Sequence, residues 1–579
     1  MPLNLSAKTG RTTLLIKIGF VCTVLLLALR PIEAFDAFWQ LQSGQYIWQT
    51  GQFIYQDTFS LASDVFRLEH CWLHDVILYL IFVAGGYPLL SLLKTLIIGL
   101  CGGLLLRWTL QKGVDAAYAL PVLALCLYAS MDSWLLRPQL WTFLFGLLYL
   151  HLLYRGRQRG VRAWCWLIPI MLVWANLHAA CIFGFALIAA FWVGELWRAW
   201  RGTATWRSLG VLTLCGLLSF AAAFVNPYGY RIPVGQLLGH LNQHKVASGD
   251  APSGMTGNME WLPPDFAQVP WFYVVMALWG VTILWRLWRR RMDVAELACF
   301  IGFSYMGFSQ IRHTTLVALM AGYFLPAAVE EIGRAFGKGR RSFARRLPVL
   351  RYATLVVLLG LSLTALARGQ LGWGVKPYEF PQAAADFVIE HRPPGNLYNA
   401  YDWGGYLMWR LYPDYLVFVD GRSTSSHYFD ASSQIENGWD GWEKSLVDEQ
   451  VNLIITRACF YDSGGPQNLI DGLTRSPGWV LVFQDETAVV YARRVPENQE
   501  IISRFGMPNH LAYRTMLAEA TRLQNEGYPR PRSWLALGRA HYALGNPKAA
   551  LAAYRYFLQT TPDNREAQTM VTLLTGRRG

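Results

Sequence analysis

Residues 34–75 read AFDAFWQLQSGQYIWQTGQFIYQDTFSLASDVFRLEHCWLHD and directly follow the first apolar segment of the chain. The stretch contains almost no basic residue, and its ionisable side chains include Asp36, Asp57, Glu69, His70, His74 and Asp75. Carboxylates beside a bilayer can deprotonate an acceptor or hold a divalent metal ion against a lipid phosphate. We therefore predict a functional site in this stretch, with a solvated loop of interfacial aromatics as the alternative.

The composition of the chain indicates a membrane protein. Of its 579 residues, 53% are hydrophobic and 15% are charged, against about 25% charged residues in soluble proteins. The formal net charge is +13, but the arginines fall in short runs between apolar segments, as they do in cytoplasmic loops. The sequence therefore predicts a polytopic membrane protein and no nucleic-acid partner.

About eleven apolar segments approach the roughly 20 residues that a membrane span needs. They lie near residues 13–30, 87–108, 115–131, 138–154, 163–178, 180–199, 206–225, 269–287, 294–309, 314–331 and 349–367. All basic runs lie on the cytoplasmic side only if residues 74–83 do not span the membrane. We therefore predict a short helix on the outer face that ends at Gly85 and Gly86. This arrangement predicts a transmembrane module at 1–370, a cytoplasmic N-terminus, a first outer loop at 31–86 and an exported C-terminal region.

Polar side chains gather at the predicted outer ends of these spans. Arg137, Arg231 and Arg312 lie there against the positive-inside trend, and a guanidinium group suits a lipid phosphate. Structural ion pairs with aspartates of the outer loops are the alternative. His178 is predicted at membrane depth, where polar groups are costly, and a hydrogen bond inside the helix bundle is the alternative there.

The composition changes near residue 378, where short apolar runs begin to alternate with helical segments. Strands are predicted at 396–400, 415–419, 451–456, 479–483 and 488–491, which gives a small α/β domain at 375–495. Asp402, Asp420 and Arg422 follow predicted strands, and ligands of open α/β sheets bind at such ends. Pairing of Asp420 with Arg422 is the alternative.

Residues 505–579 are predicted to be helical and to contain one tetratricopeptide-like hairpin. The pattern rests on Trp534, Leu537, Gly538, Gly545, Ala550, Tyr554 and Pro562. A single repeat cannot form a stable solenoid. We therefore expect this region to pack on the α/β domain or to bind a protein partner.

Several motifs together resemble a bacterial group of polytopic, C-superfamily (GT-C) glycosyltransferase-like proteins. In the first loop they are Asp36-Ala-Phe-Trp39-Gln40, Asp57-x-Phe59-Ser60 and Glu69-His70-x-Trp72-Leu73. Later ones are Arg137-Pro138-Gln139, Trp174-Ala-Asn176-Leu-His178, Asn226-Pro227-Tyr228-Gly229, Arg312-His313, Trp403-Gly404-Gly405-Tyr406 and Asp420-Gly421-Arg422. The resemblance covers about residues 30–495.

The resemblance implies sugar transfer from a polyprenyl-phosphate donor to a glycan, lipid or protein, on the outer face of a bacterial cytoplasmic membrane. It makes Asp36, Asp57 and Asp132 the candidate catalytic residues, with Asp36 and Asp132 as candidate ligands of a divalent ion such as Mg²⁺ or Mn²⁺. The candidate donor-phosphate residues are His70, His74, Arg137, Arg231, Arg312 and His313. The other cavity candidates are Gln40, Glu69, His178 and Glu260. The group usually has histidine where this chain has Gln40, so an inactive member is an alternative.

Three rival functions remain open from the sequence. An O-antigen ligase or polymerase would also use lipid-linked sugars, but its main outer loop usually comes late in the chain. A non-catalytic scaffold would recruit envelope partners through the α/β and helical regions. A transporter would place ionisable residues at the bilayer midplane, whereas most here lie at span ends.

Overall fold

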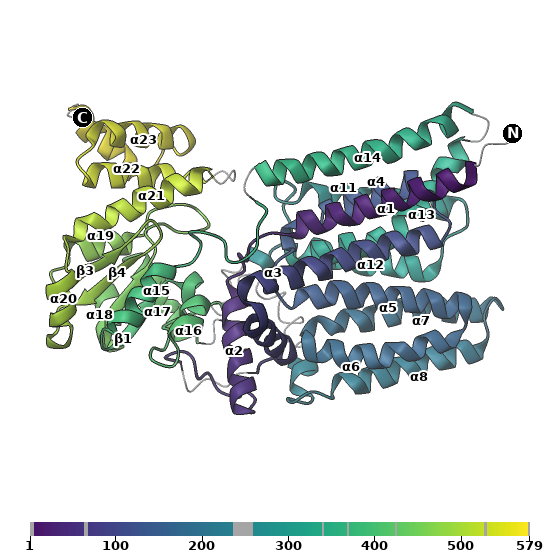
Figure 1. The fold of residues 1–579 in the computed structure, drawn as a ribbon, viewed down its shortest axis with the longest axis horizontal. Helices are drawn as coiled ribbons and strands as arrows, with labels where there is room; N and C mark the ends of the chain where they lie inside the picture. Colours follow the sequence, from purple (N-terminus) through teal and green to yellow (C-terminus); the bar gives the residue numbers. More distant parts are fainter. Residues whose placement is uncertain are drawn as a thin grey trace. The chain divides into compact units, whose positions relative to one another are not determined.

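The computed structural model describes residues 5–62, 68–235, 259–337, 341–367, 370–422, 425–525 and 530–576. The predicted outer loop after residue 225 and the last basic run therefore lie partly outside the described residues. The chain divides into two compact units (Figure 1). We call them the helical unit (Met1–Ala34, Ser43–Phe53 and Leu68–Val375) and the sheet unit (Phe35–Gln42, Ile54–Arg67 and Lys376–Gly579).

Long apolar helices build the helical unit. Each of the eleven predicted segments coincides with a described helix: α1 (Leu5–Ala28), α3 (Trp72–Gln111), α4 (Ala116–Tyr128), α5 (Gln139–Arg159), α6 (Leu167–Leu177), α7 (Ile182–Trp200), α8 (Trp206–Ala223), α11 (Pro270–Trp288), α12 (Val294–Ser309), α13 (Thr314–Gly337) and α14 (Arg341–Ala367). Among the described residues, five helical segments are both long and apolar enough to cross a membrane. The chain is a multi-pass membrane protein.

Short elements join these helices. They are η1 (Met131–Ser133), η2 (Val161–Trp166), η3 (Ala179–Cys181), η4 (Met259–Trp261) and η5 (Ile311–His313). Helix α2 (Asp36–Thr50) belongs partly to each unit, because its first seven residues group with the sheet unit. The stretch at residues 34–75 therefore contributes to both units.

Helix α3 contains the break that the sequence predicts. Gly85 (φ −164°, ψ 20°) and Gly86 (φ 63°, ψ −159°) are both non-helical. The conformation of Gly86 lies in a region that only glycine adopts readily. Two helical pieces therefore meet at this pair.

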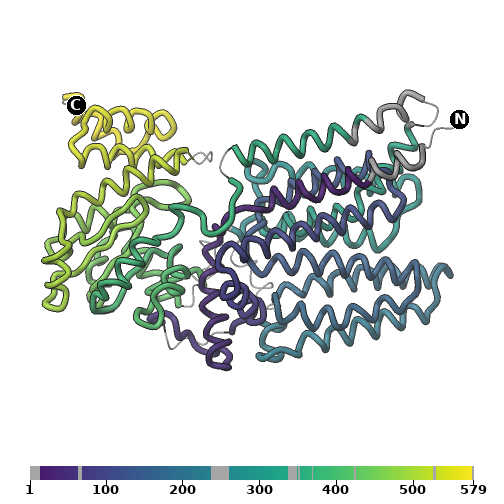
Figure 2. The backbone as a smooth tube through the Cα atoms, in the orientation of Figure 1, coloured from purple at the N-terminus to yellow at the C-terminus, as the bar shows by residue number. Residues whose placement is uncertain are grey.

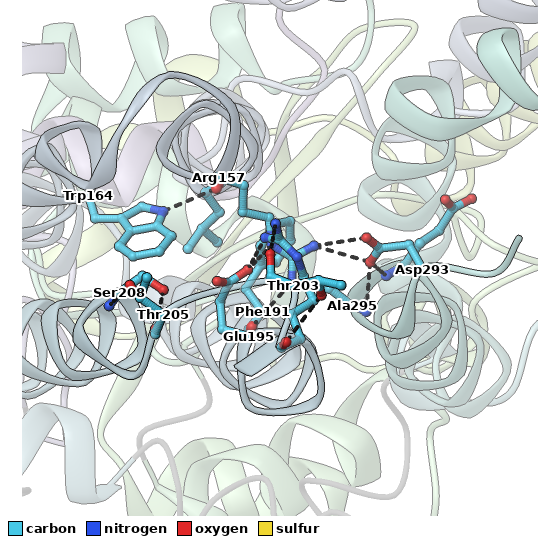
Figure 3. A network of polar contacts seen from close by, with 12 residues as sticks. Arg157, Trp164, Phe191, Glu195, Thr203, Thr205, Ser208, Asp293 and Ala295 are labelled. Atoms are coloured by element: carbon cyan, nitrogen blue, oxygen red, sulfur yellow. Dashed lines mark hydrogen bonds and ion pairs between the residues drawn. The ribbon is translucent and has the colours of Figure 1, made fainter. Parts of the chain in front are cut away.

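A buried ion-pair network joins three helices of the helical unit (Figure 3). Arg157 Nε at the end of α5 lies 2.6 Å from Glu195 Oε1 on α7, and its Nη1 lies 3.1 Å from Asp293 Oδ2 before α12. Asp293 also caps α12 by accepting hydrogen bonds from the backbone N–H groups of Ala295 and Glu296. The side chains of Arg157 and Glu195 are only 5% and 2% exposed, so removing either partner would leave a buried charge.

Further ion pairs bring other basic runs to the same end of the helices. Arg286 at the end of α11 pairs with Glu296 on α12 and with Glu331 on α13. Lys112, which follows α3, donates to the Tyr323 carbonyl (2.9 Å) and is within electrostatic range of Glu296. The ends of α3, α5, α7 and α11 that carry basic residues are thus gathered together.

The sheet unit is built on a four-stranded sheet in the order β1-β2-β4-β3. Strands β1 (Asn396–Asn399) and β2 (Val451–Thr456) are parallel, whereas β4 (Val489–Arg493) pairs antiparallel with β2 and with β3 (Trp479–Gln484). The parallel pair brings the carboxyl ends of β1 and β2 to one edge of the sheet.

The prediction of a strand at 415–419 is wrong. Val417 forms only a single bridge, with Ser60 of the first loop. The side chain of Asn399 occupies the backbone groups that would form a ladder, because its Oδ1 accepts from Phe418 N (2.9 Å) and its Nδ2 donates to Val419 O (2.8 Å). A buried apolar run therefore lies along the sheet edge without joining the sheet.

Helices surround this sheet and follow it to the C-terminus (Figure 2). They are α15 (Gln382–His391), α16 (Gly404–Leu411), α17 (Ser426–Glu436), α18 (Trp442–Asp448), α19 (Asn468–Arg475), α20 (Gln499–Phe505), α21 (Ala512–Asn525), α22 (Ser533–Ala543), α23 (Pro547–Thr560) and α24 (Arg565–Thr575), with short turns at η6 (Tyr401–Trp403), η7 (Pro496–Asn498) and η8 (Asn509–Leu511). Leu481 and Tyr491 of the sheet share one core with Met516 of α21 and Leu537 of α22. The C-terminal helices therefore pack on the α/β region, and their identity as a tetratricopeptide repeat stays a prediction.

Candidate functional site

The second half of α2 packs closely against the start of α3 within the helical unit. A Cβ at Gly44 would lie 2.0 Å from the carbonyl oxygen of Asp75, so only glycine permits this approach. Next to it, the Ser43 hydroxyl donates to Glu69 Oε2 (3.3 Å), and both side chains are buried. Glu69, a predicted cavity residue, is thereby held against α2.

Three histidines and an arginine gather in the helical unit, and we call them the histidine–arginine cluster. Its members are His70, His74, His178 and Arg312. His178 is within electrostatic range of the other three, which come from the first loop, from α3 and from η5. The sequence predicted each of them separately, and the fold brings them together.

Hydrogen bonds fix two rings of this cluster. Trp141 on α5 donates through Nε1 to His74 Nδ1 (2.9 Å). Thr142, the next residue, lies 2.7 Å from His178 Nδ1 and itself accepts from Trp174 Nε1 (3.0 Å). Both rings are therefore oriented by hydrogen bonds at Nδ1.

Arg312 and Arg137 lie beside the acidic residue Glu260 of η4. Arg137 Nη1 donates to Glu260 Oε1 (2.6 Å), while Arg312 lies over the Trp261 ring at 5.5 Å and donates through Nε to Gln310 Oε1 (2.9 Å). Burial acts to raise the pKa of Glu260, but the charge and hydrogen bond of Arg137, together with Arg312, hold it below its ordinary value. Arg137 therefore pairs with the Glu260 carboxylate while Arg312 acts on it at longer range, and these three side chains together carry a net positive charge.

The other two predicted phosphate residues are arranged differently. His313 contacts the Phe183 ring at 5.4 Å, and its Nδ1 lies 3.3 Å from the Met306 carbonyl oxygen. Arg231 is exposed at the start of a short helical segment at 231–235, next to Tyr228 and Ile232, which pack with Ala179.

Asp132 belongs to a second group of charges in the helical unit. Its pKa is raised by partial burial and lowered by the charge of Arg30 to a smaller extent, with a net rise. Lys94 donates to the Arg30 carbonyl (2.9 Å) and interacts with Glu33. Sequence reasoning missed Lys94, although an ionisable residue inside an apolar segment is itself a signal of function.

In the sheet unit, Asp57 forms a buried triad with Asp420 and Arg422. Arg422 Nη2 donates to both oxygens of Asp57 (3.1 and 3.2 Å), and its Nε donates to Asp420 Oδ1 (2.6 Å). Asp57 also accepts from Phe59 N and the Ser60 hydroxyl. The Asp420–Arg422 pairing left open by the sequence is present, and it includes Asp57.

Glycines of the resemblance motifs in the sheet unit lie close to this triad and to Asp36. A Cβ at Gly421 would lie 3.3 Å from Asp36 Oδ1, and one at Gly404 would lie 2.1 Å from the carbonyl oxygen of Val419. Gly405 approaches the Phe35 carbonyl and Trp39 in the same way. The resemblance motifs that belong to the sheet unit thus meet in one packed region. Asp36 Oδ1 also accepts from Trp39 Nε1 (3.2 Å), and the neighbouring Gln40 is buried.

Arg457, at the carboxyl end of β2, is the second buried arginine of the sheet unit. Its guanidinium lies 4.7 Å from the Trp403 ring and 5.2 Å from the Tyr461 ring, with Nη1 at 3.7 Å from Asp402 Oδ2. Burial raises the pKa of Asp402, and the charge of Arg457 opposes this rise. Sequence reasoning missed Arg457, although it follows directly on a predicted buried strand.

The described residues do not fit a divalent metal ion. In the described part of the chain, no three His, Cys, Asp or Glu side chains are placed to hold one. Asp36 and Asp132 belong to different units. We therefore derive no step through a metal.

These features define a polytopic helical membrane fold with an α/β region that follows the helices. The archaeal oligosaccharyltransferase AglB from Archaeoglobus fulgidus has a similar structure, with a TM-score of 0.52 and 11% identity over 94% of this chain and 86% of AglB. ArnT from Cupriavidus metallidurans matches with a TM-score of 0.46 and 13% identity, over 84% of this chain and 99% of ArnT. No protein-family model and no curated protein sequence matches the chain.

Proposed function

We propose that this protein is a membrane glycosyltransferase that takes a sugar from a polyprenyl-phosphate-linked donor and transfers it to an acceptor outside the cytoplasm. The observation that carries the proposal is the histidine–arginine cluster at one end of the GT-C-type helices. The similar AglB structure was determined in complex with an inhibitory peptide and a dolichol-phosphate. A phosphate-bearing lipid is the ligand that such a cluster would recognise.

In this proposal Arg312 neutralises the phosphate group that leaves the sugar. A guanidinium group offers paired N–H donors that match phosphate oxygens. The imidazole rings of His74 and His178, which hydrogen bonds at Nδ1 orient, line the proposed phosphate site. The carboxylate of Glu260 positions Arg137 and moderates the charge of the group.

Asp36 and Asp132 are the proposed bases for the acceptor hydroxyl. A positioned base contributes about 10²–10⁴-fold to the rate. Asp132 is the stronger candidate on chemical grounds, because a raised pKa makes a carboxylate a better proton acceptor. Asp57 is assigned a structural role, because Arg422, Phe59 and Ser60 engage its carboxylate.

The proposed location is a bacterial cytoplasmic membrane, crossed by eleven helices. The gathered basic ends of α3, α5, α7 and α11 would face the cytoplasm, following the positive-inside rule. The N-terminus would then be cytoplasmic and the sheet unit would be exported.

The test uses the full-length protein in lipid nanodiscs with radiolabelled polyprenyl-phosphate sugars. We expect release or transfer of the labelled sugar by the wild type. Arg312→Ala should reduce the rate strongly, and Asp132→Asn or Asp36→Asn should reduce it by about 10²–10⁴-fold, depending on which carboxylate is the base. Arg289→Ala and Asp563→Asn are matched controls, because both side chains are exposed and lie in neither charge group.

Two results would contradict the proposal. Saturable binding of the lipid without turnover would support a non-catalytic scaffold. Full activity of Arg312→Ala would remove the histidine–arginine cluster from the reaction.

A further inference from the structure

The sheet unit contains a cavity of about 620 Å³. The outer face of α21 lines it, together with the turn between β3 and β4 and the segment before α15. Its polar lining residues are Tyr378, Glu486, Arg514, Thr521, Arg522 and Asn525. The volume lies within the range of about 300–1,000 Å³ that is typical of ligand sites.

Helix α21 is held rigidly, so the face that it presents to the cavity is fixed. Glu519 Oε2 accepts from the backbone N–H groups of Ala458 (3.0 Å) and Cys459 (2.9 Å) after β2. Thr515 Oγ1 donates to the Asp485 carbonyl (2.6 Å) in the β3–β4 turn. A different face of α21 carries Arg514, Ala518, Thr521 and Asn525 at helical spacing. The small side chains in the middle of this stripe leave room for the cavity.

Tyr378 supplies an aromatic wall. Its side chain is 53% exposed, and its backbone has φ +59°, a conformation that residues other than glycine seldom adopt. Such conformations are kept where surrounding structure imposes them, and ligand clamps are among the usual places. The face of an aromatic ring carries partial negative charge, so the weakly positive C–H groups of a pyranose ring pack well against it.

The remaining lining residues suit a sugar that carries a carboxylate. Glu486 can accept from sugar hydroxyls, and Asn525 and Thr521 can both donate and accept. Arg514 and Arg522 can donate to a carboxylate, although Arg522 also lies 3.9 Å from Glu519 on its other side. An acidic peptide fits less well, because it offers the Glu486 carboxylate only backbone N–H donors, whereas each sugar ring offers several hydroxyl donors.

We propose that this cavity binds an acidic oligosaccharide, one of whose sugar rings stacks on Tyr378 while its carboxylate pairs with Arg514. This binding site does not depend on the proposed transfer reaction. Binding and sugar transfer are therefore measured separately, and failure of one leaves the other intact.

The test uses the full-length protein in nanodiscs and saturation-transfer NMR. The acidic probe is a hyaluronan tetrasaccharide, the neutral probe is chitotetraose, and the peptide probe is tetraglutamate. We expect saturable binding of the hyaluronan tetrasaccharide and about tenfold weaker binding of chitotetraose, as loss of one charge-assisted hydrogen bond predicts. Equal binding of the two saccharides, tighter binding of tetraglutamate, or no saturable binding of the acidic probe would overturn the proposal.

Variants locate the binding site. Tyr378→Ala and Arg514→Ala should each weaken binding about tenfold, and Tyr378→Phe should retain it, because the ring remains. Thr521→Trp should abolish binding by filling the cavity. Arg555→Ala is the matched control, because this exposed arginine of α23 does not line the cavity. Unchanged binding by both Tyr378→Ala and Arg514→Ala, in variants that keep the wild-type unfolding midpoint, would also overturn the proposal.

Discussion

Arg422 binds the carboxylates of Asp420 and of Asp57, which lies 365 residues before Arg422 in the sequence. The side chains of Asp57, Asp420 and Arg422 are at most 2% exposed. Arg422→Ala would leave both carboxylates buried without their counter-ion, and breaking a buried pair in this way costs about 3–5 kcal/mol. We expect a marked fall in the midpoint of thermal unfolding. We also expect protease to cleave the sheet unit more readily in the full-length variant than in the wild type.

The control for this prediction is Arg410→Ala. Arg410 pairs with Asp386, whose side chain is 64% exposed, and pairs near the surface contribute at most about 1 kcal/mol. Similar falls in the unfolding midpoint of both variants would show that the triad stabilises the protein no more than an exposed ion pair does.

Glu436 should make the stability of the sheet unit depend on pH. Burial raises its pKa from the ordinary 4.5 to about 7, with a smaller opposing contribution from the hydrogen bond donated by Tyr401 N. The folded state therefore binds this proton more tightly than the unfolded state. The resulting contribution to the stability of the sheet unit is complete below pH 4.5 and is lost as pH rises through 7.

Glu436→Gln keeps an oxygen acceptor for Tyr401 N without the ionisation. We expect the unfolding midpoint of the wild type to fall more between pH 5 and pH 8 than that of the variant. Glu500→Gln, an exposed substitution on α20, serves as the control. Identical pH profiles for the wild type and Glu436→Gln would exclude this residue as a source of pH dependence.

The individual site residues show what sequence can and cannot predict. Asp57 and Arg422 each stood out as polar residues in a motif, but their pairing depends on the tertiary fold and has no local signal. Arg137 was predicted as a phosphate ligand, and the fold places it against Glu260. The sequence thus indicates which polar residues stand out, but it does not indicate which side chains they contact in the fold.

Among the elements, the kink of α3 offers a test of backbone conformation alone. Gly86 has φ 63° and ψ −159°, and the nearest atom to an added Cβ is Pro88 Cδ at 3.6 Å. Gly86→Ala therefore introduces no clash but imposes a strained conformation, which costs about 1–3 kcal/mol. We expect a lower unfolding midpoint in detergent.

Gly103 provides the matched control within the same helix. A Cβ at Gly103 would meet only Val21 Cγ2, at 3.8 Å, and alanine favours helices over glycine by up to about 1 kcal/mol. Gly103→Ala should therefore be neutral or stabilising. An equal fall in the unfolding midpoint of both variants would contradict this prediction. It would show that an added methyl group destabilises α3 regardless of the backbone conformation of the substituted glycine.

Helices were easier to predict than strands for a physical reason. A span is defined by its own run of apolar residues, and all eleven predicted segments coincide with described helices. Residues 415–419 are also apolar, but a strand needs a partner, and Asn399 takes the hydrogen bonds that a partner strand would make. Hydrophobicity indicates burial, whereas pairing depends on neighbours that are distant in sequence.

For the whole molecule, the distribution of charge within the helical unit predicts its orientation in the membrane. Arg157, Arg286 and Lys112 are joined by shared acidic neighbours at one end of the helices. Because positively charged ends stay in the cytoplasm, the residues after α14 should be exported. A reporter enzyme fused after Gly579 tests this in the intact chain.

Alkaline phosphatase becomes active only outside the bacterial cytoplasm. Green fluorescent protein becomes fluorescent in the cytoplasm but stays dark after export through the general secretion route. We expect the phosphatase fusion to be active and the fluorescent fusion to be dark. A protease site inserted at Gly202, in the turn between α7 and α8, should resist protease added to intact spheroplasts and be cut after lysis, because Arg198 and Arg201 mark that turn as cytoplasmic. A fluorescent C-terminal fusion with an inactive phosphatase would reverse the orientation. It would also place the histidine–arginine cluster on the cytoplasmic side, where an outward-facing transfer reaction could not use it.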